Sequence, residues 1–276
     1  MTDPERFILS NKDRVALVIN LSGGKDSTRM LGYLRDRFPT VPAYCVMADT
    51  GFEHVRPIPA VDWTRTLCSR FGVELTVVRN PNKTYLEMVR RRGRFPSAQF
   101  RQCTSDLKRG PIQKFVRQLR HPVLINCMGI RAEESTQRAK QTSWSPDLAL
   151  SRSAKSGRPG RTVYNWLPIF HETTQEVLQW HWQSEVPMHP VYVPEYHSDG
   201  TTGGYLRRFS CRVCVFASDH DLRSIYQHDR EAFDLVSQLE TETGFTMKPS
   251  GSLVQILSSS VLSNSERQYN LFVRER

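Results

Sequence analysis

Residues 15–27 read VALVINLSGGKDS. A short, continuous apolar run that ends at a glycine pair predicts a buried strand followed by a tight turn. Residues 27–38, with the sequence STRMLGYLRDRF, have the spacing of an amphipathic helix. The first turn of such a helix directs its N–H groups towards the glycines, which favours an anion there. The stretch therefore predicts a strand, a helix and, between them, an anion-binding loop made of Ser22, Gly23, Gly24, Lys25, Asp26 and Ser27.

The carboxylate of Asp26 repels phosphate, so a loop that only holds phosphate does not explain it. Its presence predicts either a Mg²⁺ ion that accompanies the phosphates or a role in fixing the loop. The loop is not a Walker loop, which needs four residues between its first glycine and Gly-Lys-Ser/Thr.

Strand-like and helix-like segments alternate through the first two thirds of the chain. Further strands are expected at 43–48, 73–78, 123–130 and 166–170, and further helices at 59–71, 84–92, 108–120 and 173–185. This alternation predicts an α/β fold, a doubly wound, Rossmann-like parallel sheet that binds ligands at the carboxyl ends of its strands.

The composition divides the chain into three parts. We expect an N-terminal extension at 1–13, an α/β nucleotide-binding domain at 14–185 and a smaller, irregular and helical region at 186–276. Residues 143–162, rich in Ser, Gly, Pro and Arg, are expected to form a long mobile loop.

The net charge of +10 is concentrated in one segment. Residues 79–120 hold 12 basic side chains and only two acidic ones, Glu87 and Asp106. Such a block is typical of a solvated face or of a surface that meets phosphate. No secretory signal and no apolar run of membrane-spanning length are present, so a cytoplasmic protein with no membrane partner is expected.

The SGGKDS loop resembles that of the PP-loop ATP pyrophosphatases. Within them the chain is most similar to the phosphoadenosine phosphosulfate (PAPS) reductase family, of adenine nucleotide alpha-hydrolase-like fold, and to its DNA phosphorothioation-type relatives. Four further segments carry the resemblance: Asp49-Thr50-Gly51, Cys103-Thr104 with Lys108, Gly129 to Arg138, and Leu167-Pro168-Ile169.

The resemblance implies an enzyme that uses ATP and Mg²⁺. It implies catalytic roles for Lys25, Asp26, Lys108 and Arg131. It places the nucleotide against the six loop residues, Asp49, Thr50, Gly51 and Glu134.

Three of the six cysteines are candidate metal ligands. Cys45, Cys68 and Cys127 lie in apolar patterns and are expected to be buried small hydrophobic residues. The resemblance implies that Cys103, Cys211 and Cys214 bind a metal, and two choices stay open. One is a [4Fe–4S] cluster with an open iron, and the other is Zn²⁺ completed by His197 or His220.

Three functions are compatible with these features. The first is an ATP pyrophosphatase that adenylates an acceptor, with sulfur then transferred to DNA or tRNA from a sulfur-donor protein. The second is a sulfonucleotide reductase, against which stands the lack of any cysteine after Cys214. The third is a non-catalytic nucleic-acid-binding module, suggested by Arg90-Arg91-Arg92 and by the basic residues of 152–161.

Overall fold

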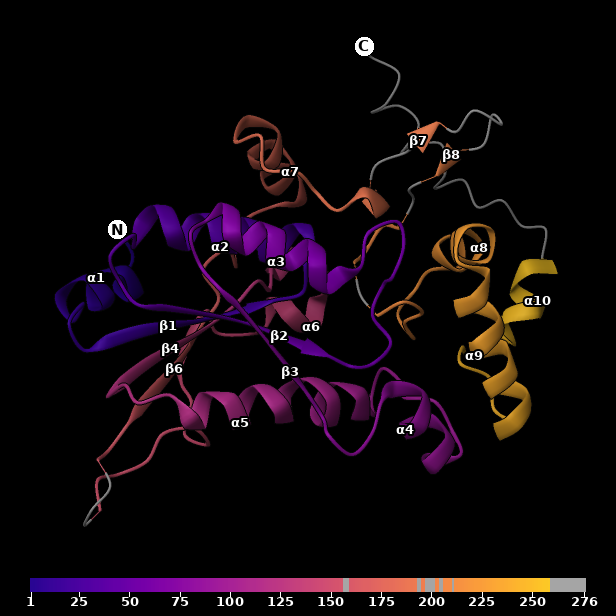
Figure 1. Ribbon diagram of the computed structural model, residues 1–276, viewed down its shortest axis with the longest axis horizontal. Helices are drawn as coiled ribbons and strands as arrows, with labels where there is room; N and C mark the ends of the chain where they lie inside the picture. Colours follow the sequence, from indigo (N-terminus) through magenta and orange to yellow (C-terminus); the bar gives the residue numbers. More distant parts are fainter. Residues whose placement is uncertain (156–158, 193–194, 197–201, 204–205, 210, 259–276) are drawn as a thin grey trace.

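A six-stranded sheet forms the centre of the protein (Figure 1). The computed structural model describes residues 1–155, 159–192, 195–196, 202–203, 206–209 and 211–258. The strand order is β3-β2-β1-β4-β6-β5, with β5 antiparallel to β6 and the other pairs parallel. The strands are β1 (Val15–Leu21), β2 (Ala43–Asp49), β3 (Leu75–Arg79), β4 (Val123–Met128), β5 (Trp144–Pro146) and β6 (Thr162–Trp166). This arrangement confirms the doubly wound, mostly parallel sheet.

Helices cover both faces of the sheet. The α-helices are α1 (Asp3–Ser10), α2 (Lys25–Arg37), α3 (Ala60–Arg70), α4 (Tyr85–Arg92), α5 (Gly110–Gln118), α6 (Thr136–Ala139), α7 (Thr174–Gln183), α8 (Asp219–His228), α9 (Arg230–Thr243) and α10 (Leu253–Ser258). Shorter elements are the π-helix η1 (Cys103–Arg109), the 3-10 helices η2 (Ala132–Glu134) and η3 (Pro190–Tyr192), and a two-stranded sheet of β7 (Glu195–Tyr196) and β8 (Thr202–Gly203). None of the described helices has the length and apolar character needed to cross a membrane.

The alternation of side chains along β1 builds two cores. Leu17 and Ile19 pack on one face with residues of α1, α2 and α3, whereas Ala16 and Val18 pack on the other with Val116 of α5. Cys45, Cys68 and Cys127 are buried in the first of these cores, as expected for small hydrophobic residues.

The C-terminal helices pack against α4. Phe233 of α9 and Leu222 of α8 share one hydrophobic cluster with Met88 and Val89 of α4. Figure 1 shows α8, α9 and α10 side by side next to the end of α4. Within the segment 79–120, α4 is thus the helix that the C-terminal helices cover.

Short local signals fix the helix ends. Thr84 and Glu87 form a capping box at the start of α4, and Gly93 ends that helix in the left-handed conformation. Thr173 and Glu176 form the same box on α7.

Two sequence predictions are wrong near the edge of the sheet. The last parallel strand is Thr162–Trp166, and residues 167–170 form a turn after it. The expected long loop contains β5, where Trp144 stacks on Tyr164 with ring centroids 4.7 Å apart. Arg161 is buried there and donates hydrogen bonds to the carbonyls of Leu150 and Val116. Buried hydrogen bonds therefore order a segment whose composition indicates a loop; residues 156–158 lie outside the described residues.

Candidate functional site

The SGGKDS loop leaves the carboxyl end of β1 and enters α2 directly. Gly23 has φ +79°, and a Cβ there would lie 2.6 Å from the hydroxyl oxygen of Thr64. Gly24 is the N-cap of α2 and makes no side-chain capping bond, so nothing of its own covers the first N–H groups of the helix. A turn of this shape requires glycine at Gly23, and it directs the first N–H groups of α2 to a position that favours an anion.

Two serine hydroxyls brace the loop from inside. The Ser27 hydroxyl donates to the carbonyl of Gly24 at 2.9 Å and lies 3.2 Å from the Ser22 hydroxyl. The amide of Gly24 in turn donates to the Ser22 oxygen at 3.4 Å. These hydrogen bonds therefore hold the loop in its turn.

Asp26 connects the loop to the carboxyl end of β4. Its Oδ1 accepts a 2.7 Å hydrogen bond from Nε of Arg131, and its Oδ2 lies 3.3 Å from Nζ of Lys25. The Arg131 side chain is 3% exposed and also donates to Glu133 and Thr174. Arg131 thus contacts Asp26 rather than the open side of the loop, which makes it a positioning residue for Asp26.

Aromatic residues that the sequence analysis missed cover the loop. Nε1 of Trp63 donates to the carbonyl of Gly23 at 3.1 Å. The Tyr192 oxygen accepts a hydrogen bond from the amide of Phe209 at 3.0 Å and another from the amide of Lys25. Burial, and after it the charge of Asp26, raises the pKa of Tyr192, so its phenol is neutral. A neutral oxygen thus lies at the amino end of α2, where an anion is expected.

The second predicted loop follows β2. Asp49 accepts from the amide of Gly51 at 2.7 Å and from Nη2 of Arg79 at 2.8 Å. The Thr50 hydroxyl donates to Glu53 at 2.7 Å. These carboxylates fix the backbone of the loop.

The Cys-x-x-Cys segment is attached to the loop after β2. Glu53 and Cys211 form an antiparallel bridge, and the amide of Arg212 donates to the carbonyl of Phe52 at 2.9 Å. Burial raises the pKa of Cys211 to about 12, against the opposing effect of Lys108, so its thiol is protonated near neutral pH. The charge that Cys211 would carry as a thiolate, the carboxylate of Glu53 and a hydrogen bond with Cys211 raise the pKa of Lys108, against the opposing effect of burial. Lys108 is therefore a cation directed at Cys211.

The three candidate metal ligands share one neighbourhood. Burial, and after it the charge of Cys214, raises the pKa of Cys103. The charge of Cys214 also raises the pKa of Cys211. Nevertheless, within the described ranges no three histidine, cysteine, aspartate or glutamate side chains are placed to hold one metal ion. The arrangement as it stands does not fit a cluster or zinc, and His197 lies outside the described residues. The metal centre stays a prediction.

The remaining predicted site residue is Glu134. It accepts from the amide of Arg131 at 3.0 Å and pairs with Arg138.

A buried histidine next to the aromatic cover predicts a pH dependence of stability. His54 is 5% exposed, its ring lies 5.1 Å from that of Phe209, and its Nε2 has no hydrogen-bond partner in the part of the chain that the structure describes. Burial, and then the charges of His189 and Arg212, lowers its pKa to about 4 from an unfolded value near 6.5, while Asp229 opposes this. The unfolded chain therefore binds the proton more tightly.

The contribution of neutral His54 to the free energy of unfolding is complete above pH 6.5 and is lost as the pH falls towards 4. We expect the free energy of unfolding to fall by about 3 kcal/mol over that range. Urea unfolding at several pH values measures it, with His54→Gln as the non-titrating control. An equally steep decline in His54→Gln would show that another group is responsible.

These features agree with a match to a known protein family. The family model of the phosphoadenosine phosphosulfate reductase domain matches residues 16–203. The chain belongs to this family. The match begins in β1 and includes the SGGKDS loop, the loop after β2 and η1.

Three proteins to which this PAPS reductase-family protein is similar have low sequence identity to it. An uncharacterized 37.8 kDa protein of Escherichia phage 186 is 24% identical over 269 residues, covering 81% of this chain and 74% of the phage protein. PAPS reductase from Candida auris is similar with a TM-score of 0.42 and 13% identity, covering 68% of this chain and 82% of that chain. The U34-tRNA thiolase NcsA from Methanococcus maripaludis, solved with its [4Fe–4S] cluster, gives a TM-score of 0.45 and 16% identity, covering 87% and 78%.

Proposed function

We propose that this PAPS reductase-family protein is a cytoplasmic ATP pyrophosphatase that adenylates an acceptor. The observation that carries the proposal is the intact SGGKDS loop, with Gly24 uncapped at the amino end of α2 and Lys25 beside it. The β- and γ-phosphates of ATP would lie at this helix end, replacing the neutral oxygen of Tyr192. The proposal includes a second step, in which sulfur from a donor protein is transferred to DNA or tRNA.

The chemistry follows from where charge develops. An acceptor oxygen bonds to the α-phosphorus, the bond to the bridging oxygen breaks, and pyrophosphate leaves with that electron pair. Lys25 and the N–H groups of α2 stabilise the negative charge on the leaving pyrophosphate. In the sulfur-transfer step, a sulfur nucleophile from the donor displaces AMP from the adenylated acceptor.

Asp26 is the residue that would hold Mg²⁺ with the phosphates. A nucleotide-bound Mg²⁺ needs only one or two protein carboxylates, because waters and phosphate oxygens complete its shell. Asp26 supplies one carboxylate, and Arg131 keeps it directed into the site. Bound Mg²⁺ would neutralise phosphate charge, and Lys25 would then leave Oδ2 of Asp26 for the phosphates.

Product analysis tests this proposal. With ATP and either tRNA or single-stranded DNA as acceptor, we expect AMP or an adenylated acceptor together with pyrophosphate. Release of ADP and orthophosphate would contradict the proposal, because it requires cleavage between the β- and γ-phosphates.

The family match supports a second candidate, a sulfonucleotide reductase that uses PAPS. A thiol-dependent sulfite assay with PAPS tests it. Sulfite formation without pyrophosphate release would replace the first proposal by the second.

A further inference from the structure

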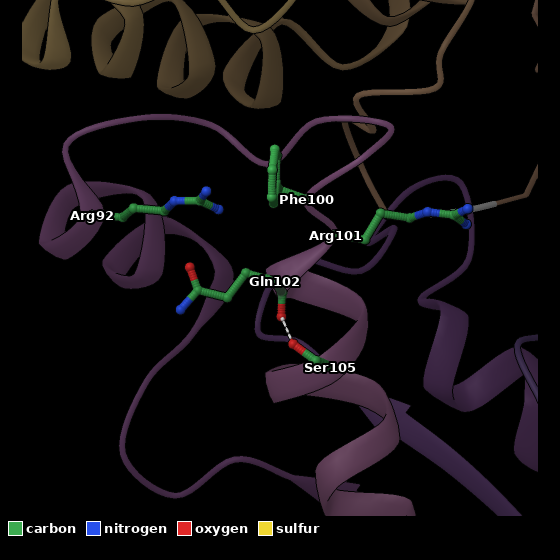
Figure 2. Close-up of a pocket in the computed structure, with 5 residues that line it drawn as sticks. All are labelled: Arg92, Phe100, Arg101, Gln102 and Ser105. Carbon is green, nitrogen blue, oxygen red and sulfur yellow. Dashed lines mark hydrogen bonds between the residues drawn. The ribbon is translucent and has the colours of Figure 1, made fainter.

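The basic segment 79–120 contains a pocket outside the SGGKDS loop (Figure 2). It lies where the chain passes from α4 to η1. It is an open depression on the surface, with a volume of about 490 Å³. The residues that line it are Arg92, Phe100, Arg101, Gln102 and Ser105.

An aromatic ring in this pocket faces solvent. Phe100 is 65% exposed, more than Phe245 at 56% and Phe216 at 41%, the other exposed phenylalanines among the described residues. Figure 2 shows the guanidinium of Arg92 extending from α4 towards the side of the pocket where Phe100 lies. An exposed ring beside arginines offers a planar surface for stacking next to cations for phosphate.

Gln102 is oriented at the base of the pocket. Its Nε2 donates to Oδ2 of Asp106 at 3.1 Å, which fixes the amide. The Ser105 hydroxyl donates to the Gln102 backbone carbonyl at 3.0 Å, as Figure 2 shows. A fixed amide offers both a donor and an acceptor to the edge of a base.

Most of the positive charge of segment 79–120 is not paired within the described structure. Ion pairs of the segment there involve only Arg79, Lys83 and Arg90, and Lys108 is directed at Cys211 and Glu53. The remaining basic side chains form no ion pair in the described ranges: Arg91, Arg92, Arg94, Arg101, Arg109, Lys114, Arg117 and Arg120. Such unpaired positive charge is complementary to a polyanion.

Arg101 connects the pocket to the cysteine neighbourhood. Its guanidinium lies 5.3 Å from the centre of the Phe216 ring, which is 41% exposed. Phe216 follows Cys214 by two residues, and Cys103 follows Arg101 by two. A chain bound in the pocket would therefore continue towards the cysteines.

We propose that this pocket binds an unstacked base of single-stranded nucleic acid, with Phe100 stacking on the base and Arg92 and Arg101 contacting the flanking phosphates. The inference names the acceptor class of the proposed function, and rests on that function only for what happens to the strand after binding. A duplex exposes no base face to Phe100, and an acidic peptide has no ring to stack on it.

Fluorescence anisotropy with a labelled mixed-sequence RNA or DNA 12-mer, without ATP, tests the proposal. Phe100→Ala is expected to weaken binding by about 5- to 150-fold, whereas Phe100→Trp keeps it. Arg92→Ala is expected to reduce the slope of log K against log salt by about 0.7, the value for one lost single-strand phosphate contact. Phe245→Ala, another exposed phenylalanine, and Arg65→Ala on α3 are matched controls that should bind as the unmodified protein does.

Three results would overturn the proposal. They are unchanged binding by Phe100→Ala, duplex binding as tight as single-strand binding, and equal binding of a poly-glutamate peptide. Because these measurements contain no ATP, they are independent of the pyrophosphate assay. If the protein binds single strands through Phe100 but releases no pyrophosphate from ATP, only the proposed function is rejected. If it releases pyrophosphate but its binding of single strands does not depend on Phe100, only the proposed role of the pocket is rejected.

Discussion

Replacing Lys25 by alanine is expected to lower ATP turnover by about 10²–10³-fold, the cost of removing one group that stabilises charge developing in the transition state. The Lys25 ammonium lies 3.3 Å from Asp26 and 5.2 Å from the centre of the Tyr192 ring, at the amino end of α2. The fold should survive, because Arg131 still pairs with Asp26 when Lys25 is absent. The loss should therefore come from chemistry and nucleotide binding.

The measurement is pyrophosphate release as a function of ATP concentration. Thermal unfolding with and without pyrophosphate provides a second readout, since a ligand at 100 times its Kd stabilises by about 2.7 kcal/mol. Pyrophosphate should stabilise the unmodified protein and a Lys140→Ala control, and should stabilise Lys25→Ala much less. Unchanged turnover in Lys25→Ala would contradict the placement of the leaving group at this loop.

The strand, loop and helix of residues 15–37 could be predicted because every signal there is local. The apolar run, the glycine pair and the helical spacing all favour the same structure, and β1 and α2 lie within two residues of the expected ranges. The position of the loop at the carboxyl end of a central strand then follows from the rule for α/β sheets.

The cover over the loop could not be predicted, because it depends on contacts between distant residues. Trp63 occupies a helical pattern typical of a core residue, and Tyr192 and Phe209 lie in a turn-rich stretch without periodicity. The bridge between Glu53 and Cys211 joins residues 158 positions apart, and no spacing in the sequence encodes it. The same holds for the orientation of Lys108 towards Cys211.

Arg131 shows what a sequence motif predicts and what it does not. Its place after β4 brings it to the loop, and the resemblance implies a catalytic role there, but its guanidinium contacts Asp26, Glu133 and Thr174. The carboxylates of Asp26 and Glu133 therefore compensate its charge. Whether a cation binds substrate or positions another side chain depends on burial, which spacing alone does not report.

Replacing the buried Arg131 by methionine is expected to lower the free energy of unfolding by about 3 kcal/mol, because removing one partner of a buried ion pair leaves the other uncompensated. The Asp26 carboxylate, 19% exposed, would keep only the weaker contact with Lys25. Urea unfolding measures the loss, and Arg138→Ala, which breaks a more exposed pair with Glu134, should cost below about 1 kcal/mol. The double variant Arg131→Met with Asp26→Asn should lose less than the sum of the two single variants, since the same pair is broken only once. Strict additivity would mean that the two side chains do not stabilise one another, and Arg131 would then have to act on the nucleotide directly.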